Sequence, residues 1–211
     1  MDVKNWHIST LAVNACKALN GNQFEAEFFS ERNDAVKHIL SLIDPNDSVG
    51  TGGSMTLTEL GIHDMLTQRG NKLLDHSTAE TINESMAICR QQLTADVFMS
   101  SANAISLDGK IVNIDGRCNR VAALSFGPKK VIIVAGVNKI AADLPSAIFR
   151  ARNVAAPMNA KRLNKKTPCA ITGKCSDCNS PERICRAFQI LHQRPYAIEY
   201  HVIIIGENLG Y

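Results

Sequence analysis

Apolar residues recur along the chain at two spacings, one typical of helices and one typical of strands. Apolar positions three and four residues apart predict helices over residues 6–19 and 35–43. Between these helices Phe24, Ala26 and Phe28 alternate with polar residues, which predicts a strand. The chain therefore begins as helix, strand and helix, the element order of an α/β protein.

The alternation of strands and helices continues to the end of the chain. Predicted strands cover residues 48–50, 71–74, 96–99, 131–135 and 200–205, and predicted helices cover residues 78–93, 121–126 and 139–152. The apolar runs VIIVA and VIII indicate strands that are buried on both faces, as in parallel sheets covered by helices. We therefore predict a three-layer α/β fold with a mostly parallel central sheet, in which ligands bind beyond the carboxyl ends of the strands.

Length, composition and charge narrow the class of protein. The chain has 211 residues, which suits a single domain over residues 1–211 at roughly 100–200 residues per domain. Its hydrophobic content of 45% is ordinary for a globular protein, and its net charge of +3 is too small to indicate a nucleic-acid partner. No apolar run approaches the ~20 residues of a membrane span, and the first residues lack a signal-peptide pattern, so we expect a cytoplasmic protein without a membrane partner.

A hairpin and a polar cluster follow the strand at residues 96–99. Two alternating runs, residues 104–107 and 110–114, flank Asp108 and Gly109, a dipeptide that predicts a two-residue turn with φ above zero at both positions. Polar side chains then gather before the next predicted helix, at Asn113, Asp115, Arg117, Asn119 and Arg120. So many polar residues between two core strands indicate a binding site.

A glycine-rich turn follows the strand at residues 48–50. Its residues Thr51, Gly52, Gly53 and Ser54 lead into a predicted helix, and the spacing of Thr56 and Glu59 matches a capping box. We expect φ above zero at Gly52 or Gly53 and backbone N–H groups that, with Thr56, bind a phosphate or carboxylate. The sequence is neither a Walker A motif nor a dinucleotide fingerprint, and a purely structural turn explains it equally well.

Three residues are candidates for catalysis, and each also has a structural explanation. Asp115 precedes a glycine in a loop, where it suits an acid or base, although an Asx turn explains it as well. Glu59 is a second acid or base candidate, and the capping box is its alternative role. Asn113 can both donate and accept hydrogen bonds, as a hydroxyl-bearing substrate requires, and local loop bonding is its alternative.

The remaining polar residues of the cluster are candidates for ligand binding. Asn103 and Asn119 offer amides for a hydroxyl group, whereas Arg117 and Arg120 offer planar guanidinium groups for a carboxylate unless one of them pairs with Asp115. Lys139, at a strand-to-helix junction, is a further cation candidate. Cys118 would be a thiolate beside two arginines if its pKa were depressed, and otherwise inert.

Four of the seven cysteines lie close together in residues 161–189, a cysteine-rich excursion. Cys169, Cys175, Cys178 and Cys185 have the spacing C-x5-C-x2-C-x6-C. Four thiolates in one short segment suit a tetrahedral zinc ion or an iron–sulfur cluster, with two disulfides or free thiols as the alternatives. The odd total and the clustered four favour a reduced compartment with one metal site over a disulfide framework.

Two segments and the closing cysteine-rich segment resemble the LUD-domain family, the lactate-utilisation proteins formerly grouped as a domain of unknown function. The segments are GTGGSMTLTELG at residues 50–61 and SANAISLDGKIVNIDGRCNRVAALSFGPKKVIIVAGVNKI at residues 101–140. The resemblance implies the three-layer fold of glucosamine-6-phosphate deaminase, ribose-5-phosphate isomerase and CoA transferases. In the sugar-phosphate relatives, the turn equivalent to residues 50–54 holds a phosphate, and the segment resembling residues 108–120 borders the reacting carbons. The family often has glycine where this chain has Cys118, which bears on how closely a ligand approaches.

Two classes of function follow. The first is the binding of a small anionic metabolite, a hydroxy or keto acid or a sugar phosphate, in a cleft reached by both residues 50–54 and residues 113–120. The second is a non-catalytic redox or assembly partner that contacts iron–sulfur or flavin subunits of a lactate-oxidising system, as the resemblance implies. The resemblance also favours iron–sulfur over zinc at the four cysteines. Catalysis and a homo-oligomeric state stay open at this point.

Overall fold

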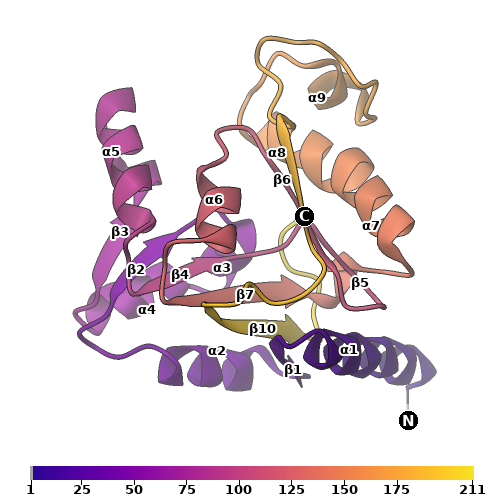
Figure 1. The fold of residues 1–211 in the computed structure, drawn as a ribbon. Coiled ribbons are helices and arrows are strands. Elements are labelled where there is room, and N and C mark those ends of the chain that lie inside the picture. The colour runs from indigo at the N-terminus through magenta and orange to yellow at the C-terminus, as the bar shows by residue number, and fades with distance from the viewer. Residues whose placement is uncertain (1) are drawn as a thin grey trace.

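A six-stranded parallel sheet forms the centre of the molecule (Figure 1). The computed structural model describes residues 2–211. The strand order is β1-β10-β7-β4-β2-β3, and the strands are β1 Glu25–Phe29, β2 Ser48–Thr51, β3 Lys72–Asp75, β4 Val97–Ser100, β7 Lys130–Gly136 and β10 Glu199–Ile205. Every one of these strands overlaps a strand predicted from the sequence, and the predicted parallel pairing is confirmed.

Helices cover both faces of this sheet. On β7, Val131 and Ile133 face one cluster of buried residues, and Ile132 and Val134 face the other, as the alternation of a strand requires. The first face packs against α1 Val3–Gly21 and α6 Asn119–Ser125, with α5 Ile82–Gln92 beside α6. The second face packs against α2 Arg32–Ser41, α3 Met55–Glu59 and α4 Ile62–Gln68. The predicted three-layer α/β fold is therefore confirmed.

A second, four-stranded sheet lies beside the first, and the sequence did not predict it as a separate unit. Its order is β8-β5-β6-β9, with β5 Ala104–Ser106, β6 Ile111–Asp115, β8 Ile140–Ala141 and β9 Ala187–Leu191. One face packs against α7 Leu144–Arg150, the π-helical turn Ala151–Ala155 and α8 Ala156–Arg162. The helix predicted from residue 139 begins only at Leu144, because β8 occupies the residues before it and Asp143 caps it.

The hairpin between β5 and β6 is present, but its turn differs from the predicted one. Only Gly109 has a positive φ, of 77°. The Gly109 N–H donates to Ser106 O at 2.8 Å and the Ser106 N–H donates to Lys110 O at 2.9 Å, which closes a three-residue loop over residues 107–109. A Cβ atom on Gly109 would lie 2.6 Å from the backbone carbon of Ala18, so glycine is required here for both conformation and space.

The cysteine-rich segment lies at one end of the molecule. After α8, the short helix α9 Pro168–Thr172 carries Cys169, and the other three clustered cysteines lie in residues 173–186, which form neither helix nor strand. In Figure 1 this segment sits at the top, beyond β6 and far from α2. No helix in residues 2–211 is long and apolar enough to span a bilayer.

Candidate functional site

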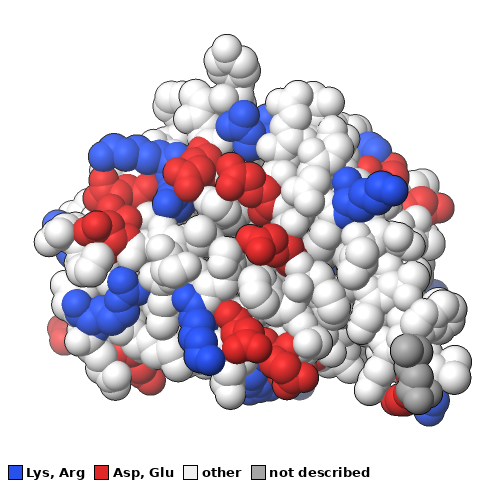
Figure 2. Space-filling view, turned by 90° about the horizontal axis from the view of Figure 1, so that it is seen from below, with Lys and Arg blue, Asp and Glu red and all other residues white. Residues whose placement is uncertain are grey.

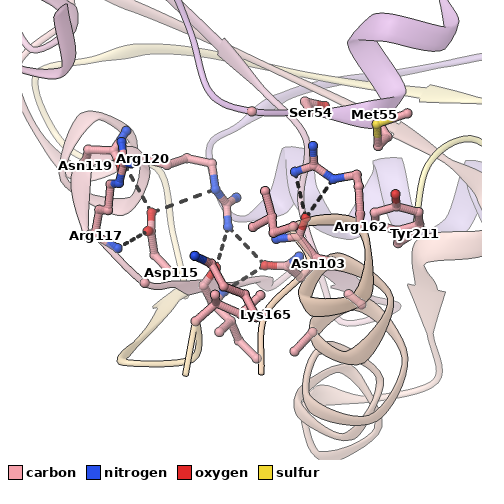
Figure 3. Close-up of a pocket in the computed structure, with 18 of the residues that line it drawn as sticks. Ser54, Met55, Asn103, Asp115, Arg117, Asn119, Arg120, Arg162, Lys165 and Tyr211 are labelled. Carbon is pink, nitrogen blue, oxygen red and sulfur yellow. Dashed lines mark hydrogen bonds and ion pairs between the residues drawn. The ribbon is translucent and has the colours of Figure 1, made fainter. Parts of the chain in front are cut away.

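A cavity of about 620 Å³ opens at the carboxyl ends of the parallel strands (Figure 3). Gly53, Ser54 and Met55 line it after β2, residues 100–103 line it after β4, and residues 114–117 enter from the end of β6. The sequence predicted that the glycine turn and the polar cluster would reach one cleft, and this prediction is confirmed. The carboxyl ends of the parallel strands β2 and β4 meet at one edge of the main sheet, and β6 of the second sheet carries the polar cluster to the same cavity.

The lining of the cavity is strongly basic. Seven of its side chains are Arg or Lys, against two that are Asp or Glu: Arg117, Arg120, Lys139, Arg162, Lys165, Arg183 and Arg186, with Asp115 and Glu182. By contrast, Figure 2 shows acidic and basic side chains interspersed on the face that carries α1 and α2. The excess of positive charge is therefore a local property of the cavity in a chain whose net charge is only +3.

Arg120 is a structural cation. Its Nη1 donates to Ser101 O at 3.0 Å and Asn113 Oδ1 at 2.7 Å, and its Nη2 donates to Asn103 Oδ1 at 3.1 Å and Ile114 O at 2.7 Å. All four N–H groups of the two terminal nitrogens are thereby used. The predicted role of Arg120 as a carboxylate clamp is wrong, because protein acceptors already occupy the fork that a carboxylate would need.

Asp115 holds the loop that precedes α6. Its Oδ1 accepts from the N–H groups of Arg117 and Cys118, both at 3.0 Å, and its Oδ2 accepts from those of Arg120 at 3.1 Å and Val121 at 3.2 Å. A carboxylate has about four acceptor positions, so none is left for a substrate proton. The structure therefore contradicts the catalytic role predicted for Asp115 and supports the Asx-turn alternative.

The other two predicted catalytic residues also make structural contacts. Asn113 is fully buried, and besides accepting from Arg120 it donates from Nδ2 to Gln189 Oε1 at 3.1 Å. Glu59 is exposed outside the cavity, where its Oε2 accepts from the Gly210 N–H at 2.9 Å. Neither side chain reaches the cavity, so the catalytic roles predicted for Asn113 and Glu59 are not supported.

The glycine turn contributes to the cavity differently from the prediction. Neither Gly52 nor Gly53 has a positive φ. The Gly52 N–H donates to Met99 O at 2.9 Å, and a Cβ atom on Gly52 would lie 2.9 Å from Cδ of Arg120, so this glycine makes room for the buried arginine. Thr51 is fully buried in β2 and does not line the cavity. Gly53 has open space around it and remains an anion-binding candidate.

The predicted capping box is replaced by a different cap. Ser54, not Thr56, is the N-cap of α3, and its Oγ accepts from the Leu57 N–H at 3.3 Å. This leaves the Thr56 hydroxyl free to accept from Lys139 Nζ at 3.0 Å. The anion cradle predicted from backbone N–H groups therefore reduces to residues 53–55 at the rim of the cavity.

Lys139 is a buried amine in the wall of the cavity. Its Nζ donates to Thr56 Oγ1 at 3.0 Å and to Ser101 Oγ at 2.8 Å. Burial, followed by the nearby charges of Arg150 and Arg120, lowers its pKa from 10.5 to about 7. A lysine with this pKa is present as both amine and ammonium at neutral pH. No feature of the sequence around Lys139 indicates that the side chain is buried.

His76, which no sequence motif marks as a candidate, also lines the cavity. His76 follows β3 in the short 3-10 helix His76–Thr78, and its Nδ1 lies 3.3 Å from Nε2 of Gln92. Burial lowers the pKa of His76, which favours the neutral ring. Arg117 also lines the cavity, and its Nη1 donates to the neutral Ser85 Oγ at 3.0 Å. Arg117 therefore remains a ligand-binding candidate, and so does Asn119, which lines the same cavity.

Cys118 occupies a position that favours glycine. It is the N-cap of α6 and has φ 67°, ψ 3°, in the left-handed region. Replacing Cys118 with glycine is expected to raise the free energy of unfolding by about 0.5–1 kcal/mol, because the strain of a side chain in this region is released. Urea denaturation under reducing conditions measures this, and Cys118→Ala is the control. An equal gain in the alanine variant would show that loss of the thiol, rather than relief of strain, is the cause.

The clustered cysteines lie beside arginines. Nη2 of Arg152 is 3.9 Å from Cys175 Sγ and 2.7 Å from Asp177 Oδ1, and Arg183 Nη1 donates to Cys178 O at 2.7 Å. All the cysteines are free thiols. Within residues 2–211, no group of three or more His, Cys, Asp or Glu side chains is placed to hold a metal ion. The segment also forms one wall of the cavity through residues 181–184 and 186.

Comparison with known proteins identifies the family. A family model described as the LUD domain matches residues 14–205. The chain belongs to the LUD-domain family. The resemblance stated from the sequence is therefore confirmed, and family membership supports a lactate-utilisation-type protein. No curated protein matches the chain at a significant level.

Two solved structures are similar to this LUD-domain protein to different extents. A crystal structure of a DUF162 family protein from Deinococcus radiodurans is similar with a TM-score of 0.56 and 13% identity, covering 95% of this chain and 98% of that one. The crystal structure of eIF2B beta from Chaetomium thermophilum is similar over 55% of this chain and 44% of that one, with 16% identity and a TM-score of 0.40. At 13% identity, the first likeness concerns the fold alone.

Proposed function

We propose that this LUD-domain protein binds a small metabolite that carries a carboxylate or phosphate group, a hydroxy or keto acid or a sugar phosphate. The observation that carries the proposal is the excess of Arg and Lys over Asp and Glu around the cavity. Arg120 is fully used within the protein, but Arg117, Arg162 and Lys165 have no acidic partner among residues 2–211. Clefts lined by one sign of charge concentrate ligands of the opposite sign.

The basic groups reach the cavity from separate parts of the chain. Arg117 comes from the loop before α6, whereas Arg162 ends α8 and Lys165 follows it. Figure 3 shows Arg117 on one side of Asp115 and Arg162 beside Met55 and Tyr211. A ligand with one acidic group and a polar body would contact cations at one end and the amides of Asn103 and Asn119 along its length. Cations for the acid group and amides for the hydroxyl or carbonyl group suit the small hydroxy and keto acids that a lactate-utilisation-type protein would bind.

Replacing Lys165 with glutamine is expected to weaken binding of the metabolite about tenfold, because it removes one charge-assisted contact. A panel of L-lactate, pyruvate, ribose 5-phosphate and inorganic phosphate, scored by thermal shift and then titrated by calorimetry, measures the effect. Lys161→Gln is the matched control, because Lys161 is an exposed cation of the same helix region that does not line this cavity. Equal losses in the two variants would indicate a general charge effect, and no binding by any member to the folded protein would overturn the proposal.

A redox or assembly role is the second candidate function. It is supported by the grouping of four free cysteines in one segment and by the position of Cys175, whose Sγ lies 3.9 Å from Nη2 of Arg152. An iron–sulfur cluster or zinc ion held by Cys169, Cys175, Cys178 and Cys185 stays a prediction. The thiols do not form a ligand set as they stand, so the segment would have to rearrange to bind a metal.

Anaerobic purification with analysis of iron, sulfide and zinc tests the metal prediction. We expect about four iron and four sulfide per chain for a cluster. About one zinc per chain would instead indicate a closed structural site. A fully reduced protein with none of the three would contradict the metal-binding role of the cysteines. Co-purification with iron–sulfur or flavin subunits would separately support the role as an assembly partner.

A further inference from the structure

Lys139 is a buried amine without a counter-ion. Its side chain is only 4% exposed, and no Asp or Glu of residues 2–211 forms an ion pair with it. The charged groups around it are Arg150 of α7, Arg120 of α6 and Glu59 of α3, and the carboxylate of Glu59 accepts from the Gly210 N–H instead. Buried lysines are ordinarily paired, so an unpaired one at the wall of a cavity calls for an explanation in function.

The hydrogen bonds around Lys139 suit a neutral amine. The Thr56 hydroxyl donates onward to Leu209 O at 3.4 Å, and the Ser101 hydroxyl donates onward to Ala102 O at 3.4 Å. Both hydroxyl oxygens are therefore acceptors toward Lys139 Nζ, and they satisfy two N–H groups. A neutral amine has two N–H groups, so its lone pair remains free, whereas an ammonium would keep a third N–H group.

We propose that Lys139 is a carbonyl-binding amine that forms an imine with a 2-oxo acid or aldehyde bound in the cavity. This inference rests on the proposed function and specifies its substrate class. The nitrogen lone pair forms the C–N bond while the carbonyl π electrons move to oxygen. The nitrogen then gives up two protons, the oxygen leaves as water, and C=N replaces C=O without net oxidation or reduction. Thr56 and Ser101, each hydrogen-bonded to the amine, are the groups placed to pass protons.

The basic lining supplies the rest of the site. Arg117 and Lys165 line the same cavity as Lys139 and supply positive charge for the acid group of a 2-oxo acid. An imine draws electrons from the neighbouring bond of the bound metabolite, so the site suits chemistry at the carbon next to the carbonyl. The lowered pKa of Lys139 supports the assignment, because the amine form is available near pH 7.

Reductive trapping tests the inference on the full chain. Pyruvate, glyoxylate or ribose 5-phosphate is incubated with the protein, sodium borohydride is added to convert any C=N to a stable secondary amine, and the modified peptide is identified by mass spectrometry. We expect labelling of Lys139 at least about tenfold above that of the exposed Lys161, no labelling with L-lactate, and a trapping rate that rises as the pH passes through about 7. Lys139→Met should abolish the label at this peptide.

The outcomes separate the inference from the proposed function. If a carbonyl compound binds in calorimetry and no borohydride adduct forms at Lys139, the inference is overturned while the proposed function stands. If the acids bind equally well to wild type and Lys139→Met, the amine has no contact with the ligand and the inference again fails. If none of the compounds binds the folded wild-type protein, the proposed function and the inference fail together. Peptide mapping of the wild-type protein keeps the test valid even if Lys139→Met does not fold.

Discussion

Replacing Arg120 with methionine is expected to lower the free energy of unfolding by about 3–5 kcal/mol, the loss typical of breaking a buried charged network. Arg120 donates to Asn103 and Asn113 and to the carbonyls of Ser101 and Ile114. Methionine fills much of the same space, but each of these acceptors would lose the hydrogen bond from Arg120, and Asn113 Oδ1 is fully buried. Urea denaturation followed by circular dichroism measures the loss.

Arg117→Met is the matched control for this prediction. It removes the same kind of side chain from the same loop, but the Arg117 side chain donates to Ser85 Oγ and is exposed. Its expected effect on unfolding is below about 1 kcal/mol, whereas binding of an anionic metabolite should weaken. Similar losses of stability in both variants would contradict the structural role assigned to Arg120.

The arrangement of the main sheet was predictable because its signals are local. Continuous apolar runs such as residues 131–135 require cover on both faces, and helical spacing between strands implies parallel connections. The second sheet was not predictable, because β8 contains only Ile140 and Ala141 and β9 is half-exposed without clear alternation. Such short strands exist only because β5 and β6 offer them partners.

The position of the site was predictable, whereas the roles of its residues were not. Segments that follow the parallel strands β2 and β4 meet at one edge, as the rule for parallel sheets requires, and β6 of the second sheet ends at the same cavity. Asp115 and Arg120 have the residue types of a catalytic pair, but the same types also tie a loop to a helix, and only the hydrogen bonds distinguish the two. Lys139 follows an apolar strand as a single lysine, so its burial depends on the chain around Gly210, which is remote in sequence.

The site therefore contains two buried cations in opposite situations. Arg120 has a protein acceptor for every N–H group of its terminal nitrogens, so its desolvation is offset by the protein itself. Lys139 has two neutral hydroxyls and no carboxylate. A bound ligand must therefore compensate the charge of Lys139, or the side chain must lose its proton. Removing the first cation should harm the fold, and removing the second should harm the function.

Replacing Lys139 with methionine is accordingly expected to raise the free energy of unfolding by about 4 kcal/mol at pH 7, because a buried charge without a partner is removed. The pKa of Lys139 falls from 10.5 to about 7 on folding, so the unfolded chain binds the extra proton between these values. The burial of Lys139 therefore lowers the stability of the wild-type protein by its full amount below about pH 7, and the stability regains about 1.4 kcal/mol per pH unit between about pH 7 and pH 10.5. The advantage of Lys139→Met should shrink over the same range and vanish near pH 10.5.

Urea denaturation of wild type and Lys139→Met at about pH 6, 7, 8 and 9 measures this dependence, with the exposed Lys161→Met as a control that should show no trend. A constant difference across the range would mean that Lys139 keeps the same charge in the folded and unfolded states. A variant less stable than wild type at every pH would mean that the hydroxyls of Thr56 and Ser101 stabilise the ammonium more than burial destabilises it. In that case Lys139 would bind a ligand as a cation, and the free amine required for imine formation would be scarce at neutral pH.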